Sequence, residues 1–307
     1  MFIRRHWWAV FYSIFLTAFT AYLAMDTFVI TRVYTVVTES EAESESAANT
    51  EQKSETALVP DTEVMVSETS YLDENIQITL SEYREYDTSI YVAEIVLSSS
   101  EYLQTAFAQN SYGRNVTEKT SEIAESTGAI LAINGDYYGA QEKGYVLRNG
   151  VIYRDEAASG QVDLVIYDNG SFSMIKEDEI TAEEILADGV QQILSFGPAL
   201  IEDGAIVVSE GDEVGKAKAS NPRTAIGMMD KLHYVFVVSD GRTEESAGLS
   251  LSQLAEFMKC LGVVTAYNLD GGGSSTMYFN GEIINNPTTN GRSIKERSVS
   301  DIVYIGY

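Results

Sequence analysis

The chain has very little cysteine, histidine and positive charge, and each shortage excludes a class of chemistry. Cys260 is the single cysteine among 307 residues, which excludes an intramolecular disulfide and a cluster of thiolate metal ligands. His6 and His233 are its two histidines, so a His-rich zinc site is excluded as well. The 20 Lys and Arg residues face 46 Asp and Glu residues, and a net charge of −26 argues against binding to a nucleic-acid backbone. Any catalysis must therefore depend mainly on carboxylates, amides, hydroxyls and arginines.

An uncharged apolar run near the N-terminus predicts a membrane helix. Residues 7–25 contain no charged side chain, and with the apolar residues 28–30 they reach the ~20 residues that cross a bilayer. Arg4 and Arg5 precede the run, which favours a cytoplasmic N-terminus and a domain outside the cell. A cleaved signal peptide is the alternative, but its apolar region is normally ~7–15 residues and ends in an A-x-A-like site, which is missing here. We therefore expect a signal-anchor and a single-pass membrane protein. A domain without disulfides outside the cytoplasm suits a bacterial cell surface.

Composition divides the chain into three parts. Residues 1–37 carry a short cytoplasmic tip and the membrane helix, which contacts the bilayer through residues 7–30. Residues 38–70 are rich in Ser and Glu and poor in large apolar side chains, so they cannot offset the entropy of ordering, and we expect a disordered acidic stalk. Residues 71–307 contain the apolar segments that a core needs and are expected to form one domain. No obligate protein partner is evident.

Short strand-like segments dominate residues 71–307, with a few helical segments between them. Alternating or β-branched runs and turn signals predict strands at 76–80, 90–97 and 129–133 and hairpins over 162–175 and 223–239. Helical patterns cover residues 118–127, 181–188 and 251–261. The last of these has the clearest limits, because Ser250 and Gln253 have the spacing of a capping box and Gly262 follows the helix. Strands with segregated helices favour an α+β or mixed α/β domain, built on a mixed β-sheet with a few packed helices.

Four strand-like segments run into tight turns that contain Gly, Asp, Asn or Arg. The four strand ends with their turns are residues 133–139, 221–227, 238–242 and 268–275. Ligand sites collect at strand ends, where a rigid scaffold holds the loops. In the fourth turn three glycines follow Asp270, so the backbone could approach a ligand closely and donate N–H groups to an anion. A strained turn is the alternative interpretation, and a P-loop is excluded because no lysine follows the glycines.

Three arginines lie in or next to turns that contain Gly, Asp or Asn. Arg223 opens an apolar strand, whereas Arg242 and Arg292 each follow a turn glycine. A guanidinium binds a phosphate or a carboxylate through two parallel hydrogen bonds, so each arginine could hold an anionic ligand. A structural ion pair is the alternative for each of them.

In content and order these loops resemble the phosphodiester glycosidase family, which includes the lysosomal uncovering enzyme that removes N-acetylglucosamine from a phosphodiester. The matching blocks are residues 134–138, 196–200, 223–227, 240–242, 246–251, 268–275, 286–287 and Arg292. The resemblance covers about residues 105–307 and is weak over residues 71–104. It implies a hydrolase that cleaves a sugar 1-phosphodiester at the bond between the anomeric carbon and oxygen. The predicted location directs this activity to glycans of the bacterial envelope or to exopolysaccharides.

Cleavage at an anomeric carbon requires a carboxylate that acts as nucleophile or as base for water. We assign this role to Asp270, with Asp240 as the second carboxylate. Arginines and backbone N–H groups would stabilise the departing phosphate, and amides would bind the sugar hydroxyls. The predicted substrate-binding residues are Asn134, Asp136, Arg223, Thr224, Arg242, Gly271, Gly272, Gly273, Ser274, Ser275, Asn286 and Arg292.

Two other functions fit the same loops. A metal-dependent phosphodiesterase would hold Mg²⁺ or Ca²⁺ through Asp136, Asp240 and Asp270 and would release a sugar phosphate from a sugar-phosphate polymer. A non-catalytic surface module would use the loops only to recognise glycans. We predict no cofactor for the glycosidase, and a divalent cation stays open through the first of these alternatives.

Overall fold

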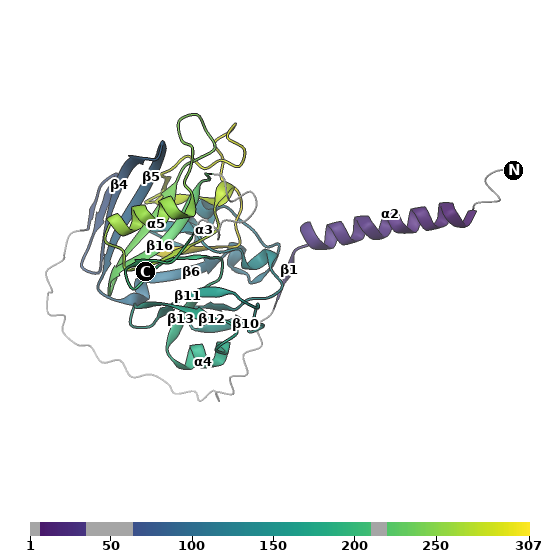
Figure 1. Ribbon diagram of the computed structural model, residues 1–307, viewed down its shortest axis with the longest axis horizontal. Coiled ribbons are helices and arrows are strands. Elements are labelled where there is room, and N and C mark those ends of the chain that lie inside the picture. The colour runs from purple at the N-terminus through teal and green to yellow at the C-terminus, as the bar shows by residue number, and fades with distance from the viewer. Residues whose placement is uncertain (1–6, 35–63, 210–219) are drawn as a thin grey trace, which may run out of the picture.

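One long helix projects from a body of β-sheets (Figure 1). The computed structural model describes residues 7–34, 64–209 and 220–307, so most of the predicted acidic stalk lies outside the described residues. The helix α2 (Trp7–Phe28) has 22 residues, and the 18-residue apolar window within it is 0% buried in the protein. By length and composition α2 could cross a membrane, as the sequence predicts, although an N-terminal signal sequence would meet the same two criteria.

The largest sheet has nine strands. In spatial order they are β15 (Ala205–Ile206), β14 (Ala199–Glu202), β18 (Thr265–Asn268), β16 (Arg223–Asp230), β17 (His233–Ser239), β5 (Thr88–Leu97), β4 (Ile76–Glu85), β3 (Ser70–Leu72) and β2 (Met65–Val66). The central hairpin of β16 and β17 pairs Arg223 with Ser239 and Ile226 with Phe236. This sheet presents the C-terminal end of β18 to the rest of the domain.

Smaller sheets pack beside it. A five-stranded sheet has the order β20 (Glu282–Ile283), β19 (Met277–Phe279), β8 (Leu131–Asn134), β21 (Asp301–Ile305) and β6 (Leu103–Phe107). A three-stranded sheet consists of β12 (Phe172–Lys176), β11 (Val162–Tyr167) and β13 (Val190–Leu194). Two pairs complete the set: β10 (Val151–Arg154) with β9 (Val146–Arg148), and β1 (Arg32–Val33) with β7 (Gly113–Arg114). Every strand pairing within residues 7–34, 64–209 and 220–307 is antiparallel, which refines the expected mixed sheet.

The main core lies between the sheets, and a helix covers the outer face of each of the three larger ones. Ile226 and Phe236 point from the nine-stranded sheet into the core that also contains Ile133 and Leu164 of the other sheets. Ala225, which precedes Ile226 on β16, points the other way, toward α5 (Leu251–Cys260). The helices α3 (Thr120–Thr127) and α4 (Ala182–Ala187) cover the five-stranded and three-stranded sheets in the same manner. This confirms the predicted α+β class.

Local sequence signals located several elements correctly. The predicted hairpins correspond to β11–β12 and β16–β17, and the predicted helices correspond to α3, α4 and α5. Ser250 caps α5 by accepting a hydrogen bond from the N–H of Gln253. Gly262 has a φ of +92°, and it follows the last cap residue, Leu261.

The chain that follows α2 pairs directly with the domain, a contact that the sequence did not predict. Arg32 pairs with Arg114 and Val33 with Gly113 in the β1–β7 ladder. The side-chain amide of Asn115 donates to carbonyls at the end of α2 and just after it, those of Thr27 and Ile30, over 3.2 Å each. A strand of two residues carries no periodic signal, and for that reason sequence reasoning missed it.

Candidate active site

Asp270 lies just beyond the C-terminal end of β18, where the nine-stranded sheet meets the five-stranded one. Its N–H donates to the carbonyl of Gly135 over 3.2 Å, and its own carbonyl accepts the side-chain amide of Asn134 over 2.6 Å. Because Asn134 ends β8, these bonds fix Asp270 at the junction of the two sheets. Its side chain remains 13% exposed, which leaves a face open to a ligand.

Asp270, Ser274 and Arg297 form one hydrogen-bonded group, which we call the Asp270 cluster. The carboxylate Oδ2 accepts the hydroxyl of Ser274 over 2.6 Å and Nη2 of Arg297 over 2.7 Å. Nε of Arg297 donates in turn to Oγ of Ser274 over 2.9 Å. Burial raises the pKa of Asp270, while the charge of Arg297 and the Ser274 hydroxyl oppose the rise. The cluster thus places a carboxylate, a hydroxyl and a guanidinium together at a partly open position.

Arg297 is a candidate functional residue that sequence reasoning missed. It stands 27 residues beyond Asp270 and outside every tight-turn motif. Its side chain is 42% exposed, so it combines a fixed contact to the carboxylate with access to solvent. The available signal, one arginine shortly before the last strand, is too common in sequences to have identified it.

The glycines after Asp270 permit close packing. Gly272, in the 3₁₀ turn η6 (Gly272–Ser274), has a φ of +64°, which glycine adopts without strain. A Cβ at Gly272 would lie 2.8 Å from Nη2 of Arg242, so a side chain would displace that guanidinium. The N–H of Gly272 donates to the carbonyl of Pro222 over 2.8 Å, and the N–H of Gly271 bonds to Asp270. These two N–H groups therefore have partners within the fold, and anion binding by the three glycines stays a prediction.

Asn134 and Thr224 support the Asp270 loop from beneath. Both are 0% exposed. Oδ1 of Asn134 accepts the hydroxyl of Thr224 over 2.8 Å and the N–H of Thr276 over 3.3 Å. Asn134 therefore ties β8, β16 and the segment after the glycines into one unit. Ser275, predicted to bind substrate, is also 0% exposed. In this structure the three buried side chains can influence a ligand only indirectly, by holding the loop in position.

Asp240 follows β17, and each of its two carboxylate oxygens accepts two hydrogen bonds. Oδ1 accepts the side-chain amide of Asn285 over 3.1 Å and the N–H of Asn286 over 2.8 Å. Oδ2 accepts the side-chain amide of Asn286 over 3.0 Å and the hydroxyl of Tyr91 over 3.3 Å. Burial and the charge of Asp240 raise the pKa of Tyr91 to about 12, so this hydroxyl stays a donor. Asn285 also donates to the carbonyl of Ser275 over 3.0 Å, which joins the loops of the two predicted catalytic carboxylates.

The three predicted arginines have different surroundings. Arg242 lies against the glycine turn and donates from Nη1 to the carbonyl of Thr289 over 2.6 Å. Arg223 is 7% exposed, and its Nε donates to the carbonyl of Leu249 over 2.9 Å on the face of the sheet that α5 covers. Arg292 is exposed and its backbone N–H donates to Oδ1 of Asn290; among the described residues its side chain has no hydrogen bond or ion pair with the Asp270 cluster. Of the three, Arg242 contacts the glycine turn through its guanidinium, and the arginine at the predicted carboxylate is Arg297.

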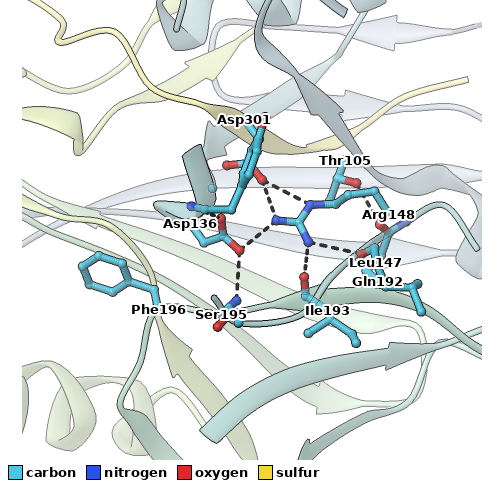
Figure 2. Close-up of polar contacts among 12 residues, drawn as sticks. Thr105, Asp136, Leu147, Arg148, Gln192, Ile193, Ser195, Phe196 and Asp301 are labelled. Atoms are coloured by element: carbon cyan, nitrogen blue, oxygen red, sulfur yellow. Dashed lines mark hydrogen bonds and ion pairs between the residues drawn. The ribbon is translucent and has the colours of Figure 1, made fainter. Parts of the chain in front are cut away.

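Asp136 lies in a buried ionic cluster with Arg148 and Asp301 (Figure 2). Nη2 of Arg148 is 2.7 Å from Oδ2 of Asp136 and 2.8 Å from Oδ2 of Asp301. Burial raises the pKa of Asp301, and the charge of Asp136 raises it further. Burial alone would lower the pKa of Arg148, but the two carboxylates outweigh it and raise that pKa. The surroundings of Asp136 are therefore those of a structural ion pair.

The donor set of a metal-dependent phosphodiesterase is not assembled in the part of the chain that the structure describes. There, no group of three or more His, Cys, Asp or Glu side chains is placed to hold a metal ion. Asp136 bonds to Arg148, Asp240 to amides and a tyrosine, and Asp270 to Arg297. Each of the three carboxylates thus has its own partners.

A family model described as phosphodiester glycosidase matches residues 127–306 of the chain, a span that contains Asp240, Asp270 and Arg297. The chain belongs to the phosphodiester glycosidase family. This confirms the resemblance inferred from the order of the loops. The α2 helix, β1 and β7 precede the matched span.

Curated relatives of this family member match part of their length. N-acetylglucosamine-1-phosphodiester alpha-N-acetylglucosaminidase from Bos taurus is 31% identical over 188 residues, which is 54% of this chain and 34% of the relative. The enzyme of the same name from Homo sapiens is 30% identical over 182 residues, 54% of this chain and 35% of the relative. A prophage-derived protein of Bacillus subtilis, YomE, is 26% identical over 201 residues, 64% of this chain and 31% of the relative. The matches thus span about a third of each relative's length.

Two solved structures share the fold. The zebrafish N-acetylglucosamine-1-phosphodiester alpha-N-acetylglucosaminidase catalytic domain, auto-inhibited by its pro-peptide, superposes with a TM-score of 0.60. It is 22% identical, over 76% of this chain and 83% of that one. A hypothetical protein from Synechocystis gives a TM-score of 0.54 at 16% identity, over 76% of this chain and 62% of that one. At these identities the likeness concerns the fold alone.

Proposed function

We propose that this phosphodiester glycosidase family member hydrolyses a sugar 1-phosphodiester at the bond between the anomeric carbon and oxygen. The observation that carries the proposal is the Asp270 cluster, a partly exposed carboxylate held by a hydroxyl and a guanidinium. The names of the bovine and human relatives describe cleavage of the same kind of bond. The products are a free sugar and a phosphomonoester.

Asp270 acts at the anomeric carbon, as nucleophile or as base for the attacking water. The transition state carries positive charge on the sugar and negative charge on the departing phosphate. Arg297 and Arg242, which lie against the Asp270 loop and its glycines, stabilise the phosphate oxygens. Water supplies a hydroxyl to the sugar and a proton to the phosphomonoester. A phosphate leaves more readily than an alkoxide, so charge stabilisation matters more here than a strong general acid.

The other predicted residues have supporting roles in this proposal. Asp240 organises the neighbouring loop. Asn286 is exposed and its side-chain amide donates to Asp240, which supports its proposed contact with sugar hydroxyls. Asn134 and Thr224 hold the Asp270 loop in place. The proposal requires no divalent cation.

The substrate class follows from the location that the sequence predicts. With α2 in the membrane and the N-terminus in the cytoplasm, the active site faces the outside of the cell. Glycosyl phosphodiesters of envelope glycans or exopolysaccharides are then the accessible substrates.

The decisive experiment replaces Asp270 by Asn in the full chain. With a model N-acetylglucosaminyl nitrophenyl phosphodiester, kcat should fall at least ~100-fold while the melting temperature stays close to that of the wild type. Asp230→Asn is the matched control, because Asp230 is an exposed acid at the far end of β16. Unchanged turnover in Asp270→Asn would reject the catalytic role of this carboxylate.

Product analysis in ¹⁸O water separates the three functions. Label in the free sugar means cleavage of the carbon–oxygen bond, which the proposal requires. Label in the phosphate means cleavage of the phosphorus–oxygen bond, as a phosphodiesterase would perform it. Binding of the model diester without any product identifies a recognition module.

A further inference from the structure

A cavity of about 380 Å³ lies beside β1, outside the Asp270 cluster. Its walls include Tyr34, Tyr112, Tyr138, Tyr153, Arg114 and Arg154. Tyr112 stacks on Tyr138 with ring centroids 5.3 Å apart and contacts the rings of Tyr34 and Tyr153 at 5.7 and 5.2 Å. The cavity thus combines an aromatic wall with two guanidinium groups.

The membrane helix and this cavity are tied together by the fold. α2 ends at Phe28 and β1 begins at Arg32, so the intervening residues 29–31 span at most about 14 Å between them. Tyr34, the residue after β1, supplies its ring to the cavity and donates its N–H to the carbonyl of Tyr112 over 2.9 Å. Figure 1 shows α2 projecting from the side of the body that carries β1. If α2 spans a bilayer, the cavity therefore lies near the membrane surface.

Gly113 in β7 leaves the space that the backbone of β1 occupies. A Cβ at Gly113 would lie 2.1 Å from the carbonyl oxygen of Arg32, so any larger residue in β7 would push the strand away. Gly113 also belongs to the cavity wall. Its lack of a side chain is what allows β1 and Tyr34 to close one side of the cavity.

The charges in the wall favour an anionic ligand. Arg154 donates from Nη1 to the carbonyls of Tyr138 and Gln141 over 3.2 and 2.7 Å, and its Nη2 is buried with no hydrogen-bond partner in the described part of the chain. Within those residues Arg154 forms no ion pair. Among the described residues Arg114 pairs with Glu142 over 3.2 Å, and the Glu142 side chain is 77% exposed. Glu142 also lines the cavity, so two arginines against one glutamate give the wall a formal charge of +1, in a chain whose net charge is −26.

We propose that this juxtamembrane cavity is a second binding site, which takes a phosphate ester at the membrane surface. The guanidinium groups of Arg114 and Arg154 attract the phosphate, and the tyrosine rings pack against the polyol or sugar that carries it. Tyrosine and arginine are also the side chains that suit the headgroup region of a bilayer. The position beside α2 favours a membrane lipid as the source of the phosphate ester over a soluble one.

The test uses the full chain in a non-ionic detergent. Native mass spectrometry measures retention of phosphatidylglycerol, which is anionic, against phosphatidylcholine, which has no net charge. Calorimetric titration with glycerol phosphate tests a soluble source. The variants are Arg114→Gln and Tyr34→Ala. Tyr34 is 47% exposed and belongs to no core cluster, so its replacement should leave the fold intact. Arg84→Gln is the control, because Arg84 is exposed on β4, away from β1 (Figure 1).

We expect the wild type to retain phosphatidylglycerol in preference to phosphatidylcholine. Loss of one charge-assisted hydrogen bond should weaken that binding roughly tenfold in Arg114→Gln, with a loss also in Tyr34→Ala and none in Arg84→Gln. Saturable binding of glycerol phosphate with the same dependence on the variants, but without a lipid preference, would support the site and identify a soluble ligand. Equal retention of both lipids without binding of glycerol phosphate, or an equal loss in Arg84→Gln, would overturn the proposal.

Discussion

Replacing Arg297 by Gln should move the acid side of the pH–activity profile to higher pH. Burial raises the pKa of Asp270, and the charge of Arg297 is the largest influence that opposes the rise. Without that charge, the pKa of Asp270 must rise further. Because the proposed reaction uses the ionised carboxylate, kcat/KM falls as the pH drops through this pKa. The pH at which activity is half lost on the acid side must therefore be higher in the variant.

The expected shift is roughly one pH unit. An opposite charge close to a carboxylate shifts its pKa by about 1–3 units. The separation of 2.7 Å and the 13% exposure of Asp270 favour a large effect, but the Arg297 side chain is 42% exposed and water screens its charge. The lower end of the range applies, which corresponds to about 1.4 kcal/mol between the two protonation states.

The assay is kcat/KM for the model diester from about pH 3 to about pH 8, which brackets both the ordinary and a raised carboxyl pKa. Arg297→Lys keeps the charge and should retain most of the wild-type pH profile, although it loses the hydrogen bond from Nε of Arg297 to Oγ of Ser274. Lys295→Gln removes a neighbouring exposed charge without touching the Asp270 cluster. An acid side that stays in place or moves to lower pH in Arg297→Gln refutes the reasoning, as does an equal shift in Lys295→Gln.

Two further predictions concern the buried acids. Arg148→Met should lower the free energy of unfolding by about 3–5 kcal/mol near neutral pH, measured by urea unfolding, because Asp136 and Asp301 lose their buried partner; an unchanged midpoint would contradict this. Burial and the nearby Glu177 raise the pKa of Asp163, so the stability that this group contributes is present below its unfolded pKa and is lost as pH rises through its folded pKa. The melting temperature of Asp163→Asn relative to wild type should therefore increase with pH, and a difference that is constant across pH would argue against the shift.

The parts of the fold that the sequence predicted depend on interactions between near neighbours. The turn at Asn169 and the Ser250–Gln253 cap of α5 are written within a few residues, and both elements formed where expected. The glycines after Asp270 likewise marked a tight turn. In each case the physical cause is local backbone geometry, which a single sequence displays directly.

The parts of the site that the sequence did not predict depend on long-range contacts. Arg148 pairs with Asp301 across 153 positions, and Arg297 reaches Asp270 across 27. No local pattern states which arginine meets which acid, since sheet order decides it. Sequence reasoning therefore recognised the loop of Asp136 but not the buried ion pair that occupies its carboxylate.

The two candidate catalytic acids, Asp240 and Asp270, differ in how far hydrogen bonds occupy their carboxylate oxygens. A carboxylate has about four lone-pair positions, and those of Asp240 all accept hydrogen bonds, so an attack from it would have to break the contacts that hold Asn286. Asp270 keeps an exposed face, and its hydroxyl and guanidinium partners orient it rather than enclose it. The proposed reaction at an anomeric carbon needs an accessible carboxylate oxygen next to a positive charge for the leaving phosphate, and for this reason we propose Asp270 as its catalytic carboxylate. The hydrogen bonds of Asp240 instead suit it to hold the loop of Asn286 in place beside the Asp270 loop.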